Sequence, residues 1–440
     1  MDSAYPTPLQ HVVAAARARY RERHPASAAQ LQAAAGALPG GNTRSVLYFA
    51  PFPLTMVRGD GCRLWDADGH AYLDALGEFT AGIYGHSHPV IREALVDALH
   101  DGLSLSSHTT REAALALEIQ RRFPSMELLR FTNSGTEANL MAVGLAKIHT
   151  GRRRILVFDG AYHGGLLAFS GGGSALNAPH DYLVGTYNDA QAAREIFRQC
   201  GSEIAAVLVE PMLGSGGCIP GQPEFLHELR TLSEAHGALL VFDEVMTSRL
   251  SAGGRQALLR IRPDLTTLGK YFGGGVSFGA FGGRREILQR FDPSRPDALA
   301  HAGTFNNNVL SMAAGLAGLV RVLSPDALAT LNERGERLRG RVNEAAQRRG
   351  LAIQATGLGS LMTLHATDTP IRRPADAAAA DPLAKELLFF DLLDRGIYLA
   401  RRGFASLSLP FGDAEVEEFI AAWDAVLDER RAVLPARRDA

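Results

Sequence analysis

The chain has 440 residues, of which 46% are hydrophobic and 21% charged, proportions that suit a globular protein with a substantial core. Lysine and arginine (45) nearly balance aspartate and glutamate (47), so the formal net charge is −2 and does not favour nucleic acid or an anionic membrane as a partner. The three cysteines, Cys62, Cys200 and Cys218, form no CxxC pair, which argues against a disulfide framework and favours a reducing compartment.

The N-terminal stretch does not have the pattern of a secretory signal, because its apolar part is short and soon interrupted by charge. Its arginine and alanine content also suits an organellar transit peptide, but Asp2, Glu22 and the low serine content weigh against that alternative. No apolar run reaches the roughly 18 residues that a membrane-spanning helix needs. We therefore expect a soluble cytoplasmic protein.

The first elements predicted along the chain are helical and then extended. Residues 9–36 are rich in alanine and predict a helix that ends at LPGGN. Residues 53–74 alternate apolar and polar side chains around glycine turns at Gly61 and Gly69, which predicts antiparallel strands.

Beyond about residue 110, helical segments alternate with short apolar runs that are rich in β-branched residues. These runs include 154–160, 204–211 and 238–245. Continuous apolar runs between helices indicate strands buried on both faces, hence a mainly parallel sheet in an α/β domain. A helix predicted to begin at Pro223 and to stop at Gly237 joins two of these strands as a βαβ crossover.

From about residue 326 the sequence is helical with charged faces, followed by short strand-like pieces. Within it, 372–381 is low in complexity and predicts an exposed insertion or mobile loop, and 428–440 predicts a solvated end. We interpret the part from residue 326 onward as a second, smaller domain.

The residues after each parallel strand are the first candidates for a site, because ligands collect at the carboxyl ends of such strands. Ser134, Gly135 and Thr136 lie at a strand-to-helix junction. Backbone N–H groups at the start of a helix have no intrahelical partner and bind phosphate readily. An ordinary helix cap is the alternative interpretation.

Asp243 ends the buried run LLVFDEV, and an ionised carboxylate in such a place needs a partner. A protonated heterocyclic nitrogen suits this role; a metal ion and a structural salt bridge are the alternatives. No histidine or cysteine pattern at ligand spacing accompanies Asp243, so no metal is predicted.

Lys270 stands beside glycines in LTTLGKYFGGG, but it does not belong to a phosphate loop. The pattern GxxxxGK[ST] fails at Asp264 and Tyr271, and GxGxxG fails at Phe278. A lysine whose cationic form is disfavoured becomes a nucleophile and forms imines with carbonyl compounds. We therefore interpret Lys270 as a covalent lysine.

A phosphate cup, a partner for a ring nitrogen, a stacking aromatic residue and an imine-forming lysine together specify pyridoxal 5′-phosphate (PLP). The stacking residue is expected to be Tyr162, in GAYHGG, or its neighbour His163. The glycines at 273–275 are expected to let the backbone pass close to this cofactor.

Several stretches resemble the class III (omega-type) aminotransferases of fold type I over nearly the whole chain. They are FTNSGTEANLMA, YHGG, VEPM, LLVFDEVMTSRL, TTLGKYFGGG, GAFGGR and HAGTFNNN. The resemblance implies a large PLP-binding α/β domain, 76–325, with a mainly parallel seven-stranded sheet, and a small α+β domain built from both termini, 1–75 and 326–440. Within the family, NTRSVLYFAPFPLT and GTFNNNV are most similar to β-phenylalanine (aromatic β-amino acid) aminotransferases.

The same resemblance implies roles for the residues around the cofactor ring. Lys270 holds the cofactor covalently and shuttles the proton, while Asp243 keeps the pyridine nitrogen protonated. Tyr162 stacks on the ring, Val245 packs against its other face, and Glu210 supports the Asp243 side of the site.

The phosphate is expected to lie on Ser134, Gly135 and Thr136. Thr304, in AGTF, matches the family residue that reaches the phosphate from the neighbouring subunit. The resemblance thus implies a homodimer with shared active sites.

For the substrate, the resemblance assigns the carboxylate to Arg44 and Arg402, with Arg401 as an alternative to Arg402. Arginine suits this task because its planar guanidinium binds a carboxylate through two hydrogen bonds. Phe79 and Phe404 are candidates to line an aromatic side-chain pocket.

The predicted activity is a ping-pong transamination from an aromatic β-amino acid to a 2-oxo acid such as 2-oxoglutarate or pyruvate. Glutamate-1-semialdehyde aminomutase is one alternative, against which Ser215, Gly165 and the GTFNNNV loop depart from the usual pattern. A transaminase for another amino acid, such as D-phenylglycine, and a non-catalytic PLP-binding protein are the others.

Overall fold

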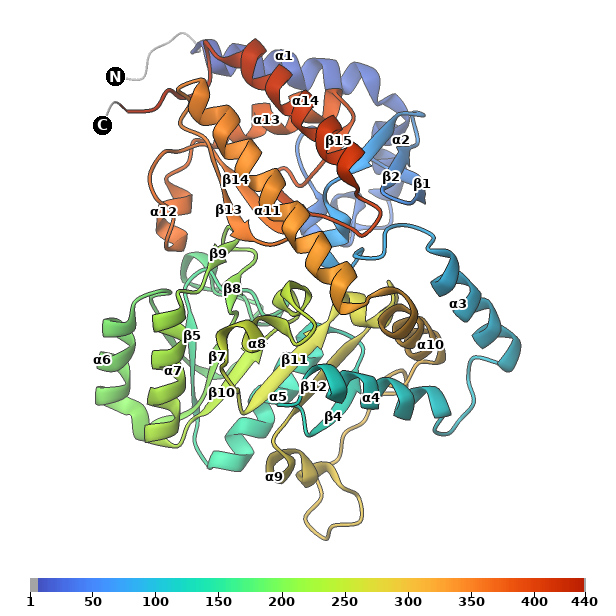
Figure 1. The fold of residues 1–440 in the computed structure, drawn as a ribbon, viewed down its shortest axis with the longest axis vertical. Helices are drawn as coiled ribbons and strands as arrows, with labels where there is room; N and C mark the ends of the chain where they lie inside the picture. Colours follow the sequence, from blue (N-terminus) through green and yellow to red (C-terminus); the bar gives the residue numbers. More distant parts are fainter. Residues whose placement is uncertain (1–6, 439–440) are drawn as a thin grey trace.

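The computed structural model describes residues 7–438. The start of the N-terminal stretch (1–6) and the last two residues of the predicted solvated end (439–440) lie outside the described residues. Its centre is a seven-stranded sheet of order β4-β12-β11-β10-β7-β5-β6 (Figure 1). The strands are β4 (Leu128–Thr132), β5 (Arg154–Phe158), β6 (Asp181–Gly185), β7 (Ile204–Val209), β10 (Leu239–Asp243), β11 (Leu265–Gly269) and β12 (Gly279–Gly283). Only β12 runs antiparallel to its neighbours, which confirms the mainly parallel sheet.

Helices cover this sheet and supply the crossovers. The principal ones are α3 (Pro89–Asp101), α4 (Thr110–Arg122), α5 (Gly135–Thr150), α6 (Ala190–Cys200), α7 (Pro223–His236), α8 (Gly254–Leu259), α9 (Arg285–Leu288) and α10 (Val309–Ala317). The predicted crossover helix is confirmed in α7, which begins at Pro223 and stops at Gly237. Gly237 has φ +67°, a left-handed conformation that glycine adopts without strain.

The two ends of the chain come together in the upper part of the molecule (Figure 1). The N-terminal elements are α1 (Pro8–Arg23), α2 (Pro25–Ala34), β1 (Met56–Asp60), β2 (Arg63–Asp66) and β3 (Ala71–Asp74). The C-terminal ones are α11 (Pro325–Arg348), β13 (Gln354–Leu358), β14 (Leu361–His365), α13 (Pro382–Asp394), β15 (Ile397–Tyr398), β16 (Phe404–Ser406) and α14 (Asp413–Arg430). β15 pairs with β3, and α1 packs on α13, so the two segments share one core.

Two local predictions were wrong, one at each end of the chain. The helix predicted over 9–36 is two helices, because Pro25 provides no backbone N–H and disfavours a helical His24. Residues 372–381 contain a short helix, α12 (Pro374–Ala378), and all but Ala380 are exposed or half-buried, as expected of an exposed insertion. The predicted solvated end is anchored as far as Leu434, which is buried, and Pro435, whose carbonyl accepts the N–H of Ala352 at 2.7 Å.

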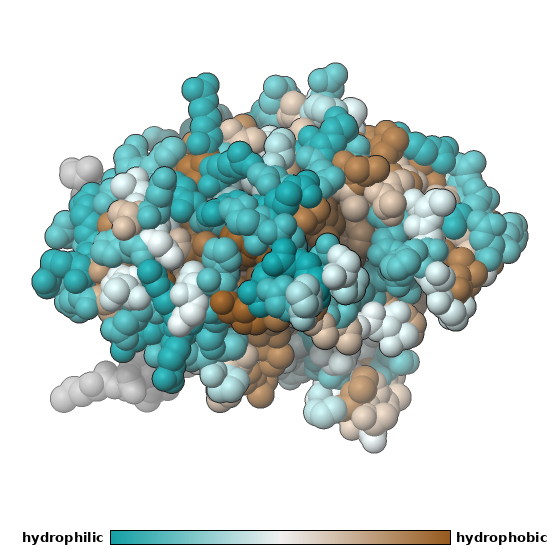
Figure 2. Space-filling view, turned by 90° about the horizontal axis from the view of Figure 1, so that it is seen from below, coloured by the Kyte–Doolittle hydropathy of each residue, from teal (hydrophilic) through white to brown (hydrophobic). Residues whose placement is uncertain are grey.

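Within residues 7–438, no single helix combines the length and the apolar character needed to cross a bilayer. One bent pair of segments, Val309–Val322 and Pro325–Arg348, meets the test by length and composition alone. The lower face of the molecule is largely hydrophilic, with smaller hydrophobic groups between the polar ones (Figure 2).

Candidate active site

Lys270 follows directly on β11 and begins a short 3-10 turn, Lys270–Gly273. Its φ of +57° is unusual for a residue with a side chain and is typical of a functional position. The Nζ atom donates a 2.7 Å hydrogen bond to the carbonyl oxygen of Phe79. Burial lowers the pKa of Lys270 to about 8, which makes the neutral, nucleophilic amine accessible near physiological pH.

Asp243 ends β10 and is held by three hydrogen bonds. Its Oδ2 atom lies 2.8 Å from both Asn139 Nδ2 and His163 Nδ1, and its Oδ1 accepts the Val245 N–H at 3.0 Å. Thr267 donates to Asn139 Oδ1 at 2.7 Å, which fixes the direction in which the Asn139 amide donates. The carboxylate is only 4% exposed, so its orientation is set before any ligand binds.

Sequence reasoning missed Asn139, whose signal is a single buried amide on the apolar side of α5. It also left His163 open as a stacking residue. The structure places the His163 ring against Asp243, where it is 1% exposed, so the stacking candidate is Tyr162.

Tyr162 is 48% exposed, which leaves its ring available to a ligand. Its N–H donates to Glu210 Oε1 at 2.9 Å, and Glu210 Oε2 accepts the Gly214 N–H at 3.0 Å. Burial raises the pKa of Glu210 to about 7. Glu210 therefore shapes the loop that carries Tyr162.

The predicted phosphate cup lies at the N-terminus of α5. Ser134 caps this helix by accepting the Glu137 N–H at 3.2 Å, and the N–H groups of Gly135 and Thr136 belong to the first turn, where the helix offers no acceptor. A Cβ atom added to Gly135 would lie 2.9 Å from Val245 Cγ2. Val245 and the cup are thus in contact across the site.

Of the glycines around Lys270, only Gly269 lies beside the cup. A Cβ atom there would lie 3.5 Å from the Gly135 nitrogen. By contrast, Gly273 approaches Phe278, and Gly274 approaches Ala314 of α10. Gly273 and Gly274 thus serve packing, while a Cβ atom at Gly275 would meet nothing within 4 Å, so the expectation that residues 273–275 pass close to the cofactor stays a prediction for Gly275 alone.

These residues fit PLP. The buried Asp243 supplies an anion for a ring nitrogen, the start of α5 supplies unpaired N–H donors, and Lys270 supplies the amine. At Gly135 and Gly269 a larger side chain would fill the space between the cup and Val245.

The structure distinguishes the two candidate arginines at 401 and 402. Arg402 directs its guanidinium over the ring of Phe79, at 5.4 Å, and donates to Ser215 Oγ at 3.0 Å, while its buried Nε has no hydrogen-bond partner among the described residues. Arg401 instead pairs with Glu386 at 2.7 Å. Arg402 is therefore the better placed of the two.

Arg44 reaches the same aromatic ring from the N-terminal segment. It forms an ion pair with Glu78, and its guanidinium carbon lies 5.8 Å from the centre of the Phe79 ring. Phe79 stacks on Phe404 at 5.9 Å, but Phe404 is only 2% exposed. Phe79 thus presents the aromatic surface, with Phe404 packed behind it.

Thr304 is exposed on a loop whose neighbour Asn306 accepts a 3.1 Å hydrogen bond from Asn133, next to the cup.

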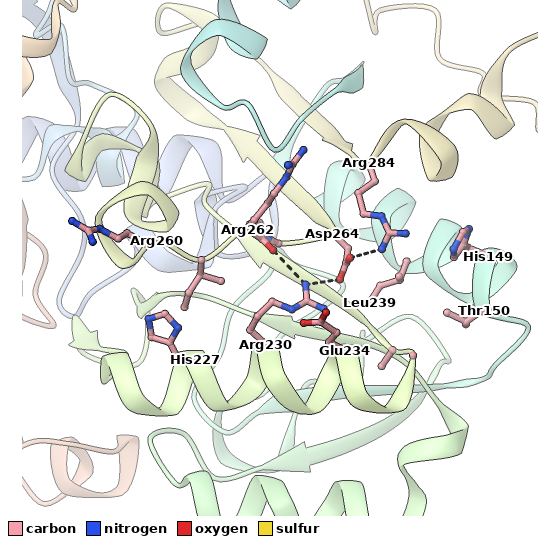
Figure 3. Close-up of a pocket in the computed structure, with 14 residues that line it drawn as sticks. His149, Thr150, His227, Arg230, Glu234, Leu239, Arg260, Arg262, Asp264 and Arg284 are labelled. Atoms are coloured by element: carbon pink, nitrogen blue, oxygen red, sulfur yellow. Dashed lines mark hydrogen bonds and ion pairs between the residues drawn. The ribbon is translucent and has the colours of Figure 1, made fainter.

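A cavity of about 620 Å³ does not belong to this site. It lies at the amino ends of β10 and β11, whereas Asp243 and Lys270 follow the carboxyl ends of the same strands (Figure 3). Asp264 in its wall accepts from Arg230 at 2.8 Å and from Arg284 at 2.7 Å. These ion pairs tie α7, through Arg230, and the end of β12, through Arg284, to the start of β11.

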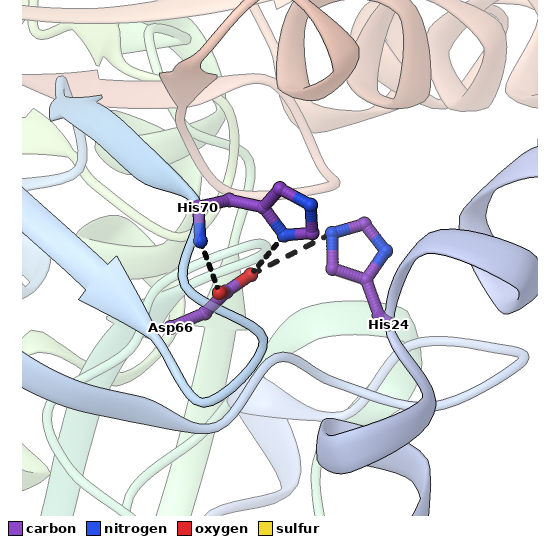
Figure 4. A group of neighbouring side chains, drawn as sticks. All are labelled: His24, Asp66 and His70. Carbon is purple, nitrogen blue, oxygen red and sulfur yellow. Dashed lines mark hydrogen bonds and ion pairs between the residues drawn. The ribbon is translucent and has the colours of Figure 1, made fainter.

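His24, Asp66 and His70 lie close enough together to resemble a metal site (Figure 4). Hydrogen bonds account for their arrangement: Asp66 Oδ2 accepts from Tyr72 at 2.7 Å and lies 3.1 Å from His70 Nδ1, while His24 Nδ1 donates to the Tyr20 carbonyl at 2.7 Å. The group fixes the break between α1 and α2 against the β2–β3 turn.

A parallel sheet whose strand ends present a nucleophilic lysine and a buried aspartate beside a helix N-terminus defines a PLP-dependent enzyme of fold type I. The chain belongs to the class-III aminotransferase family, whose model matches residues 48–409. It is thus an aminotransferase, with PLP as its cofactor and an amino donor and a 2-oxo acid as its substrates.

Individual members of the family are similar to this chain over nearly its whole length. The β-phenylalanine transaminase of Variovorax paradoxus is 53% identical over 427 residues, which cover 97% of this chain and 98% of that protein. A solved β-phenylalanine aminotransferase structure from Variovorax paradoxus superposes with a TM-score of 0.96 at 52% identity, over 98% of this chain and 100% of that one. An omega-transaminase from Sphaerobacter thermophilus gives a TM-score of 0.88 at 38% identity, over 94% and 99%.

Proposed function

We propose that the protein transfers the amino group of an aromatic β-amino acid, such as β-phenylalanine, to a 2-oxo acid by a ping-pong mechanism. The observation that carries the proposal is the position of Phe79 between Lys270 and two arginines. Its carbonyl binds the Lys270 amine, and its ring lies under the guanidiniums of Arg44 and Arg402. An aromatic side chain and a carboxylate can therefore both be bound beside the reacting amine, and a 53% identical relative is a β-phenylalanine transaminase.

Each residue around the cofactor has a distinct role in this reaction. When bound, PLP supplies the electron sink for breaking the bond to hydrogen at the amine-bearing carbon. Lys270 takes that proton and returns it, since its pKa of about 8 suits both directions of transfer. Asp243 holds a positive charge at the ring nitrogen, and the first-turn N–H groups of Gly135 and Thr136 hold the phosphate.

We also propose a homodimer in which Thr304 of each copy reaches the phosphate cup of the other, a role that suits its exposed loop next to Asn133. The proposed domains are 1–75 with 326–440, and 76–325, supported by the pairing of β15 with β3. A reducing, cytoplasmic setting is supported by the three buried, free cysteines.

The aminomutase alternative is less well supported by this site. At Ser215, where the aminomutases usually carry asparagine, the hydroxyl accepts a hydrogen bond from Arg402 and so takes part in holding the carboxylate-binding guanidinium. An aminomutase also returns the amino group to the same molecule and needs no external 2-oxo acid.

A panel of amino donors, each with 2-oxoglutarate and with pyruvate, tests the proposal. Aromatic β-amino acids should give the highest kcat/KM. Equal or higher values with aliphatic α-amino acids would refute the assignment of an aromatic β-amino acid as the donor. Turnover of glutamate-1-semialdehyde without an acceptor would establish aminomutase activity instead.

A further inference from the structure

Lys385 lines two cavities together with Arg402 and was not among the residues singled out by the sequence. Two cavities, of about 410 and 370 Å³, meet at α12, and both are lined by Lys385 and Arg402. The first cavity is also lined by Phe79, whose carbonyl binds Lys270, so one cavity joins Lys385 and Arg402 to the aromatic residue beside the reacting amine.

The charge of Lys385 is not balanced within the described part of the chain. Its Nζ forms no ion pair or hydrogen bond there, and the adjacent Glu386 is occupied by Arg17 at 2.6 Å and Arg401 at 2.7 Å. Burial, reinforced by the charge of Arg402, lowers the pKa of Lys385. The electrostatic environment therefore favours an anion beside Lys385.

The position of Lys385 on its helix adds to this imbalance. It lies near the N-terminus of α13 (Pro382–Asp394), where the helix dipole disfavours a cation. Asp381 caps this helix and accepts the N–H groups of Leu383 and Ala384. The Asp381 carboxylate is thus engaged by main-chain N–H groups and forms no ion pair with Lys385.

We propose that Lys385 binds the distal carboxylate of a 2-oxo dicarboxylic acid, while Arg402 binds the carboxylate next to the keto group. The inference rests on the proposed function, and it assigns the acceptor as a dicarboxylate such as 2-oxoglutarate. In that half-reaction the amino group moves to the keto carbon and the keto oxygen leaves as water, so the product is an amino dicarboxylate. A monocarboxylate such as pyruvate leaves Lys385 unpaired and is the poorer acceptor.

The ratio of kcat/KM for 2-oxoglutarate to that for pyruvate, measured with one amino donor, tests the proposal. The donor half-reaction is common to both acceptors, so the ratio isolates contacts to the acceptor. We expect Lys385→Met to lower this ratio by about 10-fold or more, the worth of a charge-assisted hydrogen bond, and Lys385→Arg to retain most of it. Arg401→Met, which removes a neighbouring charge already bound by Glu386, should leave the ratio unchanged.

An unchanged ratio in a folded Lys385→Met protein would overturn the proposal. If that variant does not fold, inhibition of the unmodified protein by glutarate and by butyrate tests the proposal. Glutarate should inhibit more strongly than butyrate, and equal inhibition by the two acids would contradict a dicarboxylate site. The donor used is whichever the amino-donor panel identifies, so failure of the β-amino acid assignment is seen in the panel and leaves this test intact.

Discussion

The side-chain amine of Lys270 donates a 2.7 Å hydrogen bond to the main-chain carbonyl of Phe79, 191 positions earlier in the chain. Phe79 belongs to a short segment in which Glu78, Phe79 and Thr80 all have positive φ, at 47°, 50° and 82°. Such a run is strained for residues with side chains and persists only where the surroundings enforce it. The strained segment thus joins the residue that does the chemistry to the ring that faces the substrate region.

The pH dependence of cofactor capture follows from Lys270. Its pKa in the cofactor-free protein is lowered to about 8, so the amine is cationic below this pH and neutral above it. Because only the neutral amine attacks the cofactor aldehyde, the rate of covalent capture should rise with pH and level off above about 8. Stopped-flow absorbance after mixing cofactor-free protein with PLP measures this rate.

Lys270→Ala is the control for capture: it should give no visible band that borohydride reduces and should lower kcat by at least about 100-fold. A midpoint near 10, the ordinary range of lysine, would contradict the desolvated amine.

Asp243 and Asn139 give a graded pair of variants. Asp243→Asn removes the anion needed at the ring nitrogen and should lower kcat by about 100-fold or more. Asn139→Ala removes one hydrogen bond to the carboxylate, worth about 1–3 kcal/mol, and so should reduce kcat by a smaller factor. Single-turnover rates with the amino donor measure both, and a larger loss in Asn139→Ala than in Asp243→Asn would refute this order.

The parts of the site that the sequence predicts are those carried by contiguous residues. Ser134, Gly135 and Thr136 are recognisable because the strand, the loop and the helix start follow one another, and Lys270 follows directly on a buried strand. The Asn139–Asp243 contact could not be predicted, since it joins residues 104 positions apart through packing of α5 on the sheet. The sequence also does not show why residue 274 is glycine. The reason is again a distant contact, since a Cβ atom at Gly274 would collide with the main chain of α10.

The two ends of the chain show a similar limit. Alanine-rich periodicity predicts helix over 9–36, but the hydrogen bonds that fix His24 come from Tyr20 and, across the fold, Tyr72. Likewise, whether Arg401 or Arg402 is placed to bind the substrate carboxylate depends on Glu386, which forms an ion pair with Arg401. Neighbouring identical residues cannot be told apart without their partners in space.

Arg44 should contribute to binding of the donor carboxylate. Replacing it with alanine removes a charge-assisted hydrogen bond and should raise KM for β-phenylalanine by about 10- to 100-fold, with the cofactor spectrum unchanged. Arg401→Ala is the matched control, since Glu386 already binds its guanidinium, and its KM should remain near that of the unmodified protein. Steady-state kinetics decide; similar KM values in the two variants would exclude Arg44.

Arg249 should contribute to stability rather than to binding. Its fully buried guanidinium donates to Ser360 Oγ at 3.1 Å, to Ser406 Oγ at 2.8 Å and to the Leu407 carbonyl, so it ties the segment after β10 to the C-terminal sheet. Arg249→Met leaves buried acceptors unpaired and should lower the free energy of unfolding by about 2 kcal/mol. Denaturant unfolding measures this, with the exposed Arg153→Met as control; equal stability of the two variants would refute the anchor.

Thr304 allows a test of the shared active site by mixing two defective proteins. Thr304→Glu places a carboxylate where the proposed dimer holds the partner's phosphate and should weaken PLP binding by like-charge repulsion, while Lys270→Ala lacks the amine. In a hybrid dimer, one site combines the intact Lys270 of one copy with the intact Thr304 of the other. Random exchange of the two proteins should therefore restore about a quarter of the unmodified activity, because half of the dimers are hybrids with one good site each.

The control for this experiment is the double variant Lys270→Ala, Thr304→Glu mixed with the unmodified protein. Its hybrids place both changes in one chain, so each of the two sites contains one defect. Such hybrids should be inactive, and the mixture should retain only the activity of the unmodified dimers. If the two single variants stay inactive after exchange that mass spectrometry verifies, Thr304 does not serve the partner's site.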